Sequence, residues 1–102
     1  MDKTYTLNEI KDKLFPVFRS FPVERAVVFG SFAKGKQLLS SDVDIIIYSE
    51  GKIKGIDFYG VLETITETLR IPVDLFEASQ IVEGSRAERE IHETGVIIYE
   101  RA

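Results

Sequence analysis

Hydrophobic residues recur at helical spacing in two long parts of this chain, each preceded by a residue that can cap a helix. Thr6 and Glu9 form a capping-box pattern before residues 7–20, where Pro16 is expected to produce a kink. Asp57 is expected to cap the second helix. The predicted buried stripes are Ile10, Leu14, Val17 and Phe18 in the first helix, and Phe58, Leu62, Ile65 and Leu69 in the second.

Shorter runs rich in Val and Ile follow a different pattern and are predicted to form β-strands. They cover residues 24–29, 42–48, 71–78 and 96–99. Between the last two runs, a capping pattern at Ser85 and Glu88 predicts a third helix that ends at Gly95. Residues 31–36 are expected to form one or two helical turns. Because helices and strands alternate, we expect an α/β (α+β) fold with a small mixed β-sheet flanked by helices.

Length and composition favour a single domain over residues 1–102, with 44% hydrophobic and 29% charged residues. No run approaches the ~18 apolar residues of a membrane span and the N-terminus lacks a signal-peptide pattern, so a soluble cytoplasmic protein is expected. A net charge of −4 argues against direct nucleic-acid binding. Without cysteine, any metal must be held by oxygen ligands or by His92, which is more simply a solvated helix residue.

Two aspartates stand one residue apart where the second strand begins. Asp42 and Asp44 are expected to point to the same side of that strand, and two such close carboxylates raise each other's pKa unless a cation lies between them. A hard dication such as Mg²⁺ or Mn²⁺ fits this need. Asp74, in the third strand, is expected to face away from its apolar neighbours. If the second and third strands are adjacent, Asp74 joins the pair and completes a site for two metals.

The step Gly30-Ser31 follows the first strand and is expected to receive phosphate oxygens through backbone N–H groups and the Ser31 hydroxyl. Lys34 and Lys36 would add positive charge. Each feature also has a simpler interpretation: Gly-Ser is usually a turn, the serine–aspartate pair before the second strand is usually turn chemistry, and Asp74 is more often an edge residue. Their combination favours a site.

The spacing GS-x10-DxD, from Gly30-Ser31 to Asp42-Val43-Asp44, resembles the signature of the DNA polymerase β-like nucleotidyltransferase superfamily. The fuller string FGSFAKG…SDVDIII is similar to that of the minimal nucleotidyltransferases (MNT), which are often antitoxins paired with a HEPN-domain toxin. The resemblance extends over nearly the whole chain. It implies the nucleotidyltransferase fold.

The resemblance also implies roles for individual residues. Asp42 and Asp44 would hold two Mg²⁺ ions, and Asp74 would help to hold the ion that activates the acceptor. The implied nucleotide-binding residues are Gly30, Ser31, Lys34 and Ser41, with Gly30 and Ser31 gripping the β and γ phosphates. Lys34 stands where the family often has arginine. Lysine retains the positive charge but lacks the geometry for a bidentate contact with phosphate.

As an MNT-type enzyme, the chain would transfer AMP from ATP, or a nucleotide from another NTP, to a hydroxyl of its partner. The resemblance implies a tyrosine on a HEPN toxin as acceptor. One alternative is a binding antitoxin that neutralises its partner by covering it. Another, ranked lower because no second domain is offered for the acceptor, is a small-molecule nucleotidyltransferase.

Overall fold

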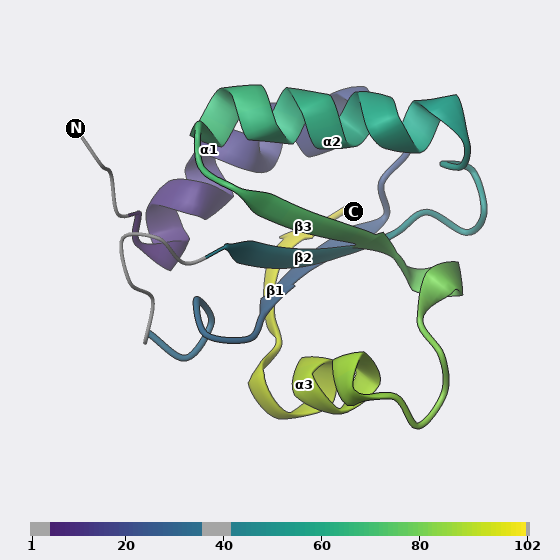
Figure 1. Ribbon diagram of the computed structural model, residues 1–102. Coiled ribbons are helices and arrows are strands. Elements are labelled where there is room, and N and C mark those ends of the chain that lie inside the picture. Colours follow the sequence, from purple (N-terminus) through teal and green to yellow (C-terminus); the bar gives the residue numbers. More distant parts are fainter. Residues whose placement is uncertain (1–4, 36–41, 102) are drawn as a thin grey trace.

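A four-stranded mixed sheet organises the computed structural model, which describes residues 5–35 and 42–101. The strands lie in the order β3-β2-β1-β4, with β2 and β3 parallel and the other neighbours antiparallel. Helices α1 and α2 cover one face of the sheet and α3 lies on the other (Figure 1). The elements are α1 (Leu7–Ser20), β1 (Arg25–Phe29), β2 (Val43–Tyr48), α2 (Ile56–Leu69), β3 (Val73–Glu77), α3 (Arg86–Thr94) and β4 (Val96–Glu100). The predicted α/β class and small mixed sheet are confirmed.

Helix α1 has the boundaries and the buried face that the sequence predicted. The Thr6 hydroxyl accepts the N–H of Glu9 at 3.1 Å, and the Glu9 carboxylate accepts the N–H of Thr6 at 2.9 Å, which completes the capping box. Its four stripe residues all enter the core beneath α1 and α2. Over residues 5–35 and 42–101, no helix combines the length and the apolar character needed to span a membrane.

Helix α2 begins two residues earlier than predicted. Asp57 does not cap it, because Gly55 occupies the N-cap position with φ of +60° and no side chain accepts a capping hydrogen bond there. The chain enters the helix through this glycine turn, and Asp57 lies in the first turn, where a negative charge favours the positive end of the helix dipole. The expected stripe still faces inward: Ile65 and Leu69 are fully buried, with Val61 beside them.

Residues 31–35 form hydrogen-bonded turns rather than the predicted helix. The N–H of Lys34 donates to the Gly30 carbonyl, and that of Gly35 donates to the Phe32 carbonyl, both at 3.2 Å. Lys36, the last residue of this prediction, lies outside the described residues. Phe32 is buried in the core beneath α1 and α2, so one apolar side chain anchors the turn that follows β1.

A second, smaller core lies between the sheet and α3. Ile91 of α3 packs against it, and its buried members are Val27, Phe29 and Ile46. Ser85 caps α3 by accepting the N–H of Glu88 at 3.2 Å, as predicted. The reciprocal bond of the predicted capping box is absent, because the Glu88 carboxylate accepts the N–H of Gly84 instead, at 2.8 Å.

Glu77 ends β3 as a buried carboxylate that accepts four hydrogen bonds. Ser49 donates its N–H and hydroxyl at 3.2 and 2.8 Å, and Ser79 donates its N–H at 2.7 Å and its hydroxyl at 2.5 Å. These bonds join the ends of β2 and β3 and cap a short 3-10 helix, η1 (Ala78–Gln80), which the sequence did not predict. Burial alone would raise the pKa of Glu77, but the hydrogen bonds outweigh it and hold the pKa below its ordinary value.

Glu77→Gln is expected to lower the free energy of unfolding by about 2–3 kcal/mol at pH 7, because an amide offers one acceptor oxygen to four donors. Since the pKa of Glu77 is lower in the folded state than in the unfolded state, its contribution is complete above the unfolded pKa and is lost as the pH falls through the folded pKa. Urea unfolding at several pH values should therefore show the deficit shrinking as the pH falls below the ordinary pKa of glutamate. Glu67→Gln, at an exposed position of α2, is the control. Equal losses of unfolding free energy in both variants would contradict a stabilising role for the hydrogen bonds of Glu77.

Candidate active site

Asp44 and Asp74 lie side by side on the neighbouring parallel strands β2 and β3. They are direct partners in the strand register, between the pairs Val43–Val73 and Ile45–Leu75. Those flanking side chains belong to the core beneath α1 and α2, and side chains alternate along a strand, so the two aspartates point to the opposite face, where α3 lies. The strand adjacency on which the site prediction depends is confirmed.

The pKa of Asp44 is raised to about 6. Burial of the carboxyl group is the largest cause, followed by the negative charge of Asp74, a hydrogen bond between the two carboxyls, and the charges of Glu90 and Asp42. The pair therefore holds a proton more tightly than an isolated aspartate does. A divalent cation would replace that proton, and carboxylate oxygens are the ligands that Mg²⁺ and Mn²⁺ prefer. Asp44 and Asp74 thus fit a hard divalent metal.

Asp42 lies immediately before β2 and is exposed to solvent. Its negative charge contributes to the raised pKa of Asp44. Within residues 5–35 and 42–101, however, no three acidic or histidine side chains are arranged to hold a metal ion. The structure thus brings two of the three predicted ligands together and leaves Asp42 nearby. Because like charges hold carboxylates apart unless a cation compensates them, the complete set would require Asp42 to turn toward the pair.

Gly30, directly after β1, is pressed against Asp44. Phe29 is the register partner of Asp44 in the antiparallel pair of β1 and β2, so the next residue passes beside the carboxylate. Gly30 has φ of +78°, and a Cβ atom there would stand 2.5 Å from Oδ2 of Asp44. Only glycine fits this approach without displacing the carboxylate. Ser31 follows Gly30 along the chain at a half-exposed position.

The remaining predicted nucleotide-binding residues are less fully placed. Lys34 is exposed in the turn after Ser31, where it can add positive charge at the rim of the site. Ser41 lies outside the described residues. The N–H of Gly30 donates to the Thr94 hydroxyl at 2.8 Å, so this amide already has a protein partner. Phosphate contacts at the turn would therefore come from Ser31 and the residues after it.

Two residues of α3 reach this site and were missed from the sequence. Thr94 holds the Gly30 amide, and Oε2 of Glu90 lies 3.5 Å from the point where a Cβ of Gly30 would stand. The charge of Glu90 also helps to raise the pKa of Asp44. The sequence offered one signal for these residues: their spacing of four places both on one face of the helix. That spacing does not predict which strand the face contacts.

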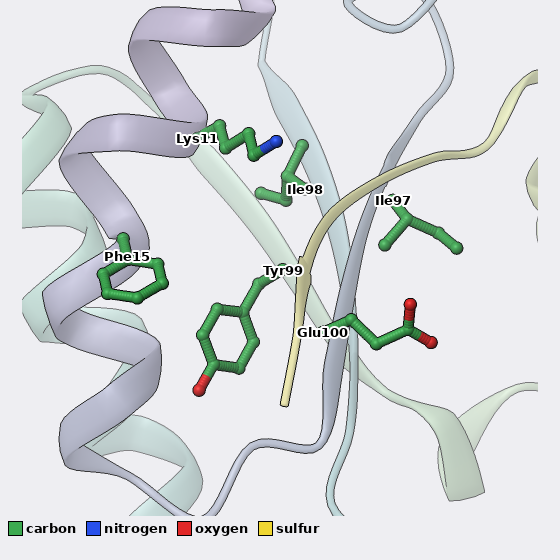
Figure 2. Close-up of a pocket in the computed structure, with 6 residues that line it drawn as sticks. All are labelled: Lys11, Phe15, Ile97, Ile98, Tyr99 and Glu100. Atoms are coloured by element: carbon green, nitrogen blue, oxygen red, sulfur yellow. The ribbon is translucent and has the colours of Figure 1, made fainter. Parts of the chain in front are cut away.

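A separate pocket lies between α1 and β4, at the edge of the sheet opposite β3. Figure 2 shows the residues that line it, Lys11, Phe15, Ile97, Ile98, Tyr99 and Glu100. Its carboxylate, Glu100, is paired with Arg25 at 2.8 Å. Nothing in this lining matches the pair of carboxylates beside a glycine turn, so this pocket is separate from the site predicted at Asp44 and Asp74.

Comparison with protein families decides the class of this site. A family model described as "Polymerase beta, Nucleotidyltransferase" matches residues 12–102, a range that contains the glycine turn and all three aspartates. The chain belongs to this nucleotidyltransferase family. As expected from the resemblance, it is a nucleotidyltransferase, and divalent metals are typical of the family.

One sequence relative and two solved structures are similar to this nucleotidyltransferase. It is 36% identical over 76 residues to "Putative protein adenylyltransferase MJ0435" of Methanocaldococcus jannaschii, an alignment that covers 74% of this chain and 81% of the relative. A solved toxin–antitoxin structure with AMP-PNP has a TM-score of 0.74 at 19% identity, over 89% of this chain and 73% of that one. The structure of the tri-AMPylated Shewanella oneidensis HEPN toxin in complex with MNT antitoxin has a TM-score of 0.69 at 15% identity, over 94% of this chain and 74% of that one. These structures share the nucleotidyltransferase fold.

Proposed function

We propose that this nucleotidyltransferase transfers AMP from ATP to a tyrosine hydroxyl of a HEPN-domain toxin in a Mg²⁺-dependent reaction in the cytoplasm, and so silences the toxin. The observation that carries the proposal is the pairing of Asp44 with Asp74 directly beside the Gly30-Ser31 turn. The relative named as a protein adenylyltransferase and the toxin–antitoxin neighbours support the choice of acceptor.

Three carboxylates would hold the metal. Asp44 and Asp74 would supply the paired oxygens and Asp42 the third carboxylate, to bind two Mg²⁺ ions. When bound, such ions stabilise negative charge on the attacking and leaving oxygens of a phosphoryl transfer. Asp74 is more exposed than Asp44, and in this proposal it would face the entering acceptor hydroxyl.

The glycine turn would hold the other end of the nucleotide. Ser31 would donate its hydroxyl to the β and γ phosphates, and Lys34 would add positive charge at the rim. With the triphosphate fixed, the tyrosine oxygen would form a bond to the α phosphorus while the bond from that phosphorus to pyrophosphate breaks. The tyrosine proton passes to water in this step, and pyrophosphate leaves with the electrons of the broken bond. The residues of this chain contribute mainly by orienting the two reactants.

Incubation of the purified protein with labelled ATP, Mg²⁺ and a candidate HEPN-domain toxin tests the proposal. The toxin should become labelled, and labelling should require both the metal and Asp44. A matched reaction with Asp44→Asn provides the baseline. Labelling by the wild type no greater than this baseline would reject the proposed transfer.

Neutralisation by binding alone is the second candidate. Phe15 and Ile97 are apolar but 48% and 51% exposed near β4, which gives the chain a contact surface separate from the aspartates. A double variant, Asp42→Asn with Asp44→Asn, separates the two functions in cells. If it still protects cells from the toxin and remains in complex with it, binding carries the biological role; loss of protection with the complex intact supports catalysis.

A further inference from the structure

The last turn of α3 ends against the first residue of the nucleotide-binding turn. Thr94 donates its hydroxyl proton to the carbonyl of Glu90 at 2.6 Å, one helical turn earlier. The same oxygen accepts the N–H of Gly30 at 2.8 Å. A hydroxyl has one proton, and here the helix uses it, so the lone pairs of Thr94 are the groups left to face Gly30. The side chain is thereby oriented as an acceptor.

The position of α3 on β1 is closely defined as well. Gly95 follows the helix, and a Cβ atom there would approach Cγ1 of Val27 to 3.0 Å and collide with the carbonyl oxygen of Ile91. Ile91 packs on the apolar side chains of β1 and β2 that form the smaller core. The helix end is thus held against the strand whose end carries Gly30, and Thr94 transmits that position to the turn.

Gly30 is buried, so its N–H would have no water to bond with if Thr94 did not accept it. A buried amide without a partner is unfavourable, and the turn could relieve this only by moving. Movement of Gly30 would shift the neighbouring Ser31, which is proposed to bind the phosphates. It would also alter the approach to Asp44, whose Oδ2 is the atom nearest to the position that a Cβ of Gly30 would occupy.

We propose that Thr94 is a positioning residue for nucleotide binding: its hydroxyl fixes the Gly30 amide and so sets where Ser31 meets the phosphates. This inference rests on the proposed function of the same site. It assigns α3 a role in the site beyond covering the sheet. Thr94 acts through Gly30 and is not expected to touch the nucleotide, so its effect should fall on nucleotide affinity.

Thr94→Val keeps the shape of the side chain and removes the acceptor. The KM for ATP in the transfer reaction, and the Kd for ATP with Mg²⁺ measured by calorimetry, should each rise about 5- to 20-fold, the range expected for one lost buried hydrogen bond. Thr94→Ser retains the hydroxyl and should restore both values. The matched control is Thr68→Val, because the Thr68 hydroxyl also donates to a carbonyl four residues earlier, at 2.7 Å, in a helix that is not at this site.

Each outcome bears on a separate statement. If Thr94→Val lowers the melting temperature as Thr68→Val does but leaves the KM and Kd unchanged, Thr94 is merely structural and the inference is wrong. If the wild type binds ATP without transferring AMP, the proposed function fails, and the Kd comparison alone decides the role of Thr94. A wild type that binds no ATP overturns both.

Discussion

Replacing Asp44 by asparagine should reduce AMP transfer to the HEPN toxin by at least about 10³-fold. The amide keeps the shape of the side chain but removes the negative charge that, with Asp74, would hold a dication. Transfer kinetics at saturating Mg²⁺ measure the effect. Asp12→Asn removes an exposed carboxylate from α1 and should leave the rate unchanged. A rate for Asp44→Asn within about 10-fold of the wild type would exclude Asp44 as a metal ligand.

The same variant should be more stable than the wild type when no metal is present. The pKa of Asp44 is raised to about 6 in the folded protein, so the folded state binds this proton more tightly than the unfolded chain does. Stability is therefore lost as the pH rises from about 4 through about 6, and remains lost above it. A neutral asparagine avoids that loss.

Thermal unfolding in a chelator measures this gain. At pH 8, Asp44→Asn should be stabilised by about 1 kcal/mol after allowance for solvent screening, or about 4–8 °C in Tm. The difference should disappear near pH 4, where the wild-type carboxyl is also neutral. A variant that melts at or below the wild type at pH 8 would show that the carboxylate pair is not a source of electrostatic strain.

Local patterns predicted most of the fold because most of its boundaries are set by local interactions. The capping box of Thr6 and Glu9 and the burial period of α1 depend on residues a few positions apart. The start of α2 could not be predicted in this way, because Asp57 is a good cap by type, whereas the backbone turn at Gly55 determines where the helix begins. The 3-10 helix after β3 is capped by local bonds of Glu77 with Ser79 and Gln80, but the burial of Glu77 as their carboxylate partner also depends on Ser49, 28 positions away.

In the candidate site, too, the features set by local patterns could be predicted and those set by long-range contacts could not. Alternation along a strand was sufficient to place Asp44 and Asp74 on one face once their strands were taken as neighbours. The contact of Thr94 with Gly30 joins residues 64 positions apart, and no spacing rule connects a helix C-terminus with a particular strand end. The aspartate motif was therefore visible in the sequence, while the support of the turn by α3 required the tertiary structure.

Gly30→Ala should be the most damaging single change in the turn after β1. At φ of +78° any side chain is strained, and the new Cβ would stand 2.5 Å from Oδ2 of Asp44, so the carboxylate must move away from its place beside Asp74. When a group that orients reactants is displaced by about 1 Å, the rate typically falls about 10²-fold. We expect transfer to fall by at least that factor, and the free energy of unfolding to fall by about 2–4 kcal/mol.

Gly51→Ala separates the two causes, because Gly51 has the same φ of +78° but no atom within 4 Å of the added Cβ. Backbone strain alone should lower the free energy of unfolding of this control by about 1 kcal/mol and leave transfer intact. The excess loss in Gly30→Ala then measures the collision with Asp44. Combining Gly30→Ala with Asp44→Ala removes the carboxylate, so urea unfolding of the double variant should show that excess largely abolished. If the excess persists, the turn is disrupted by something other than its contact with the aspartate pair.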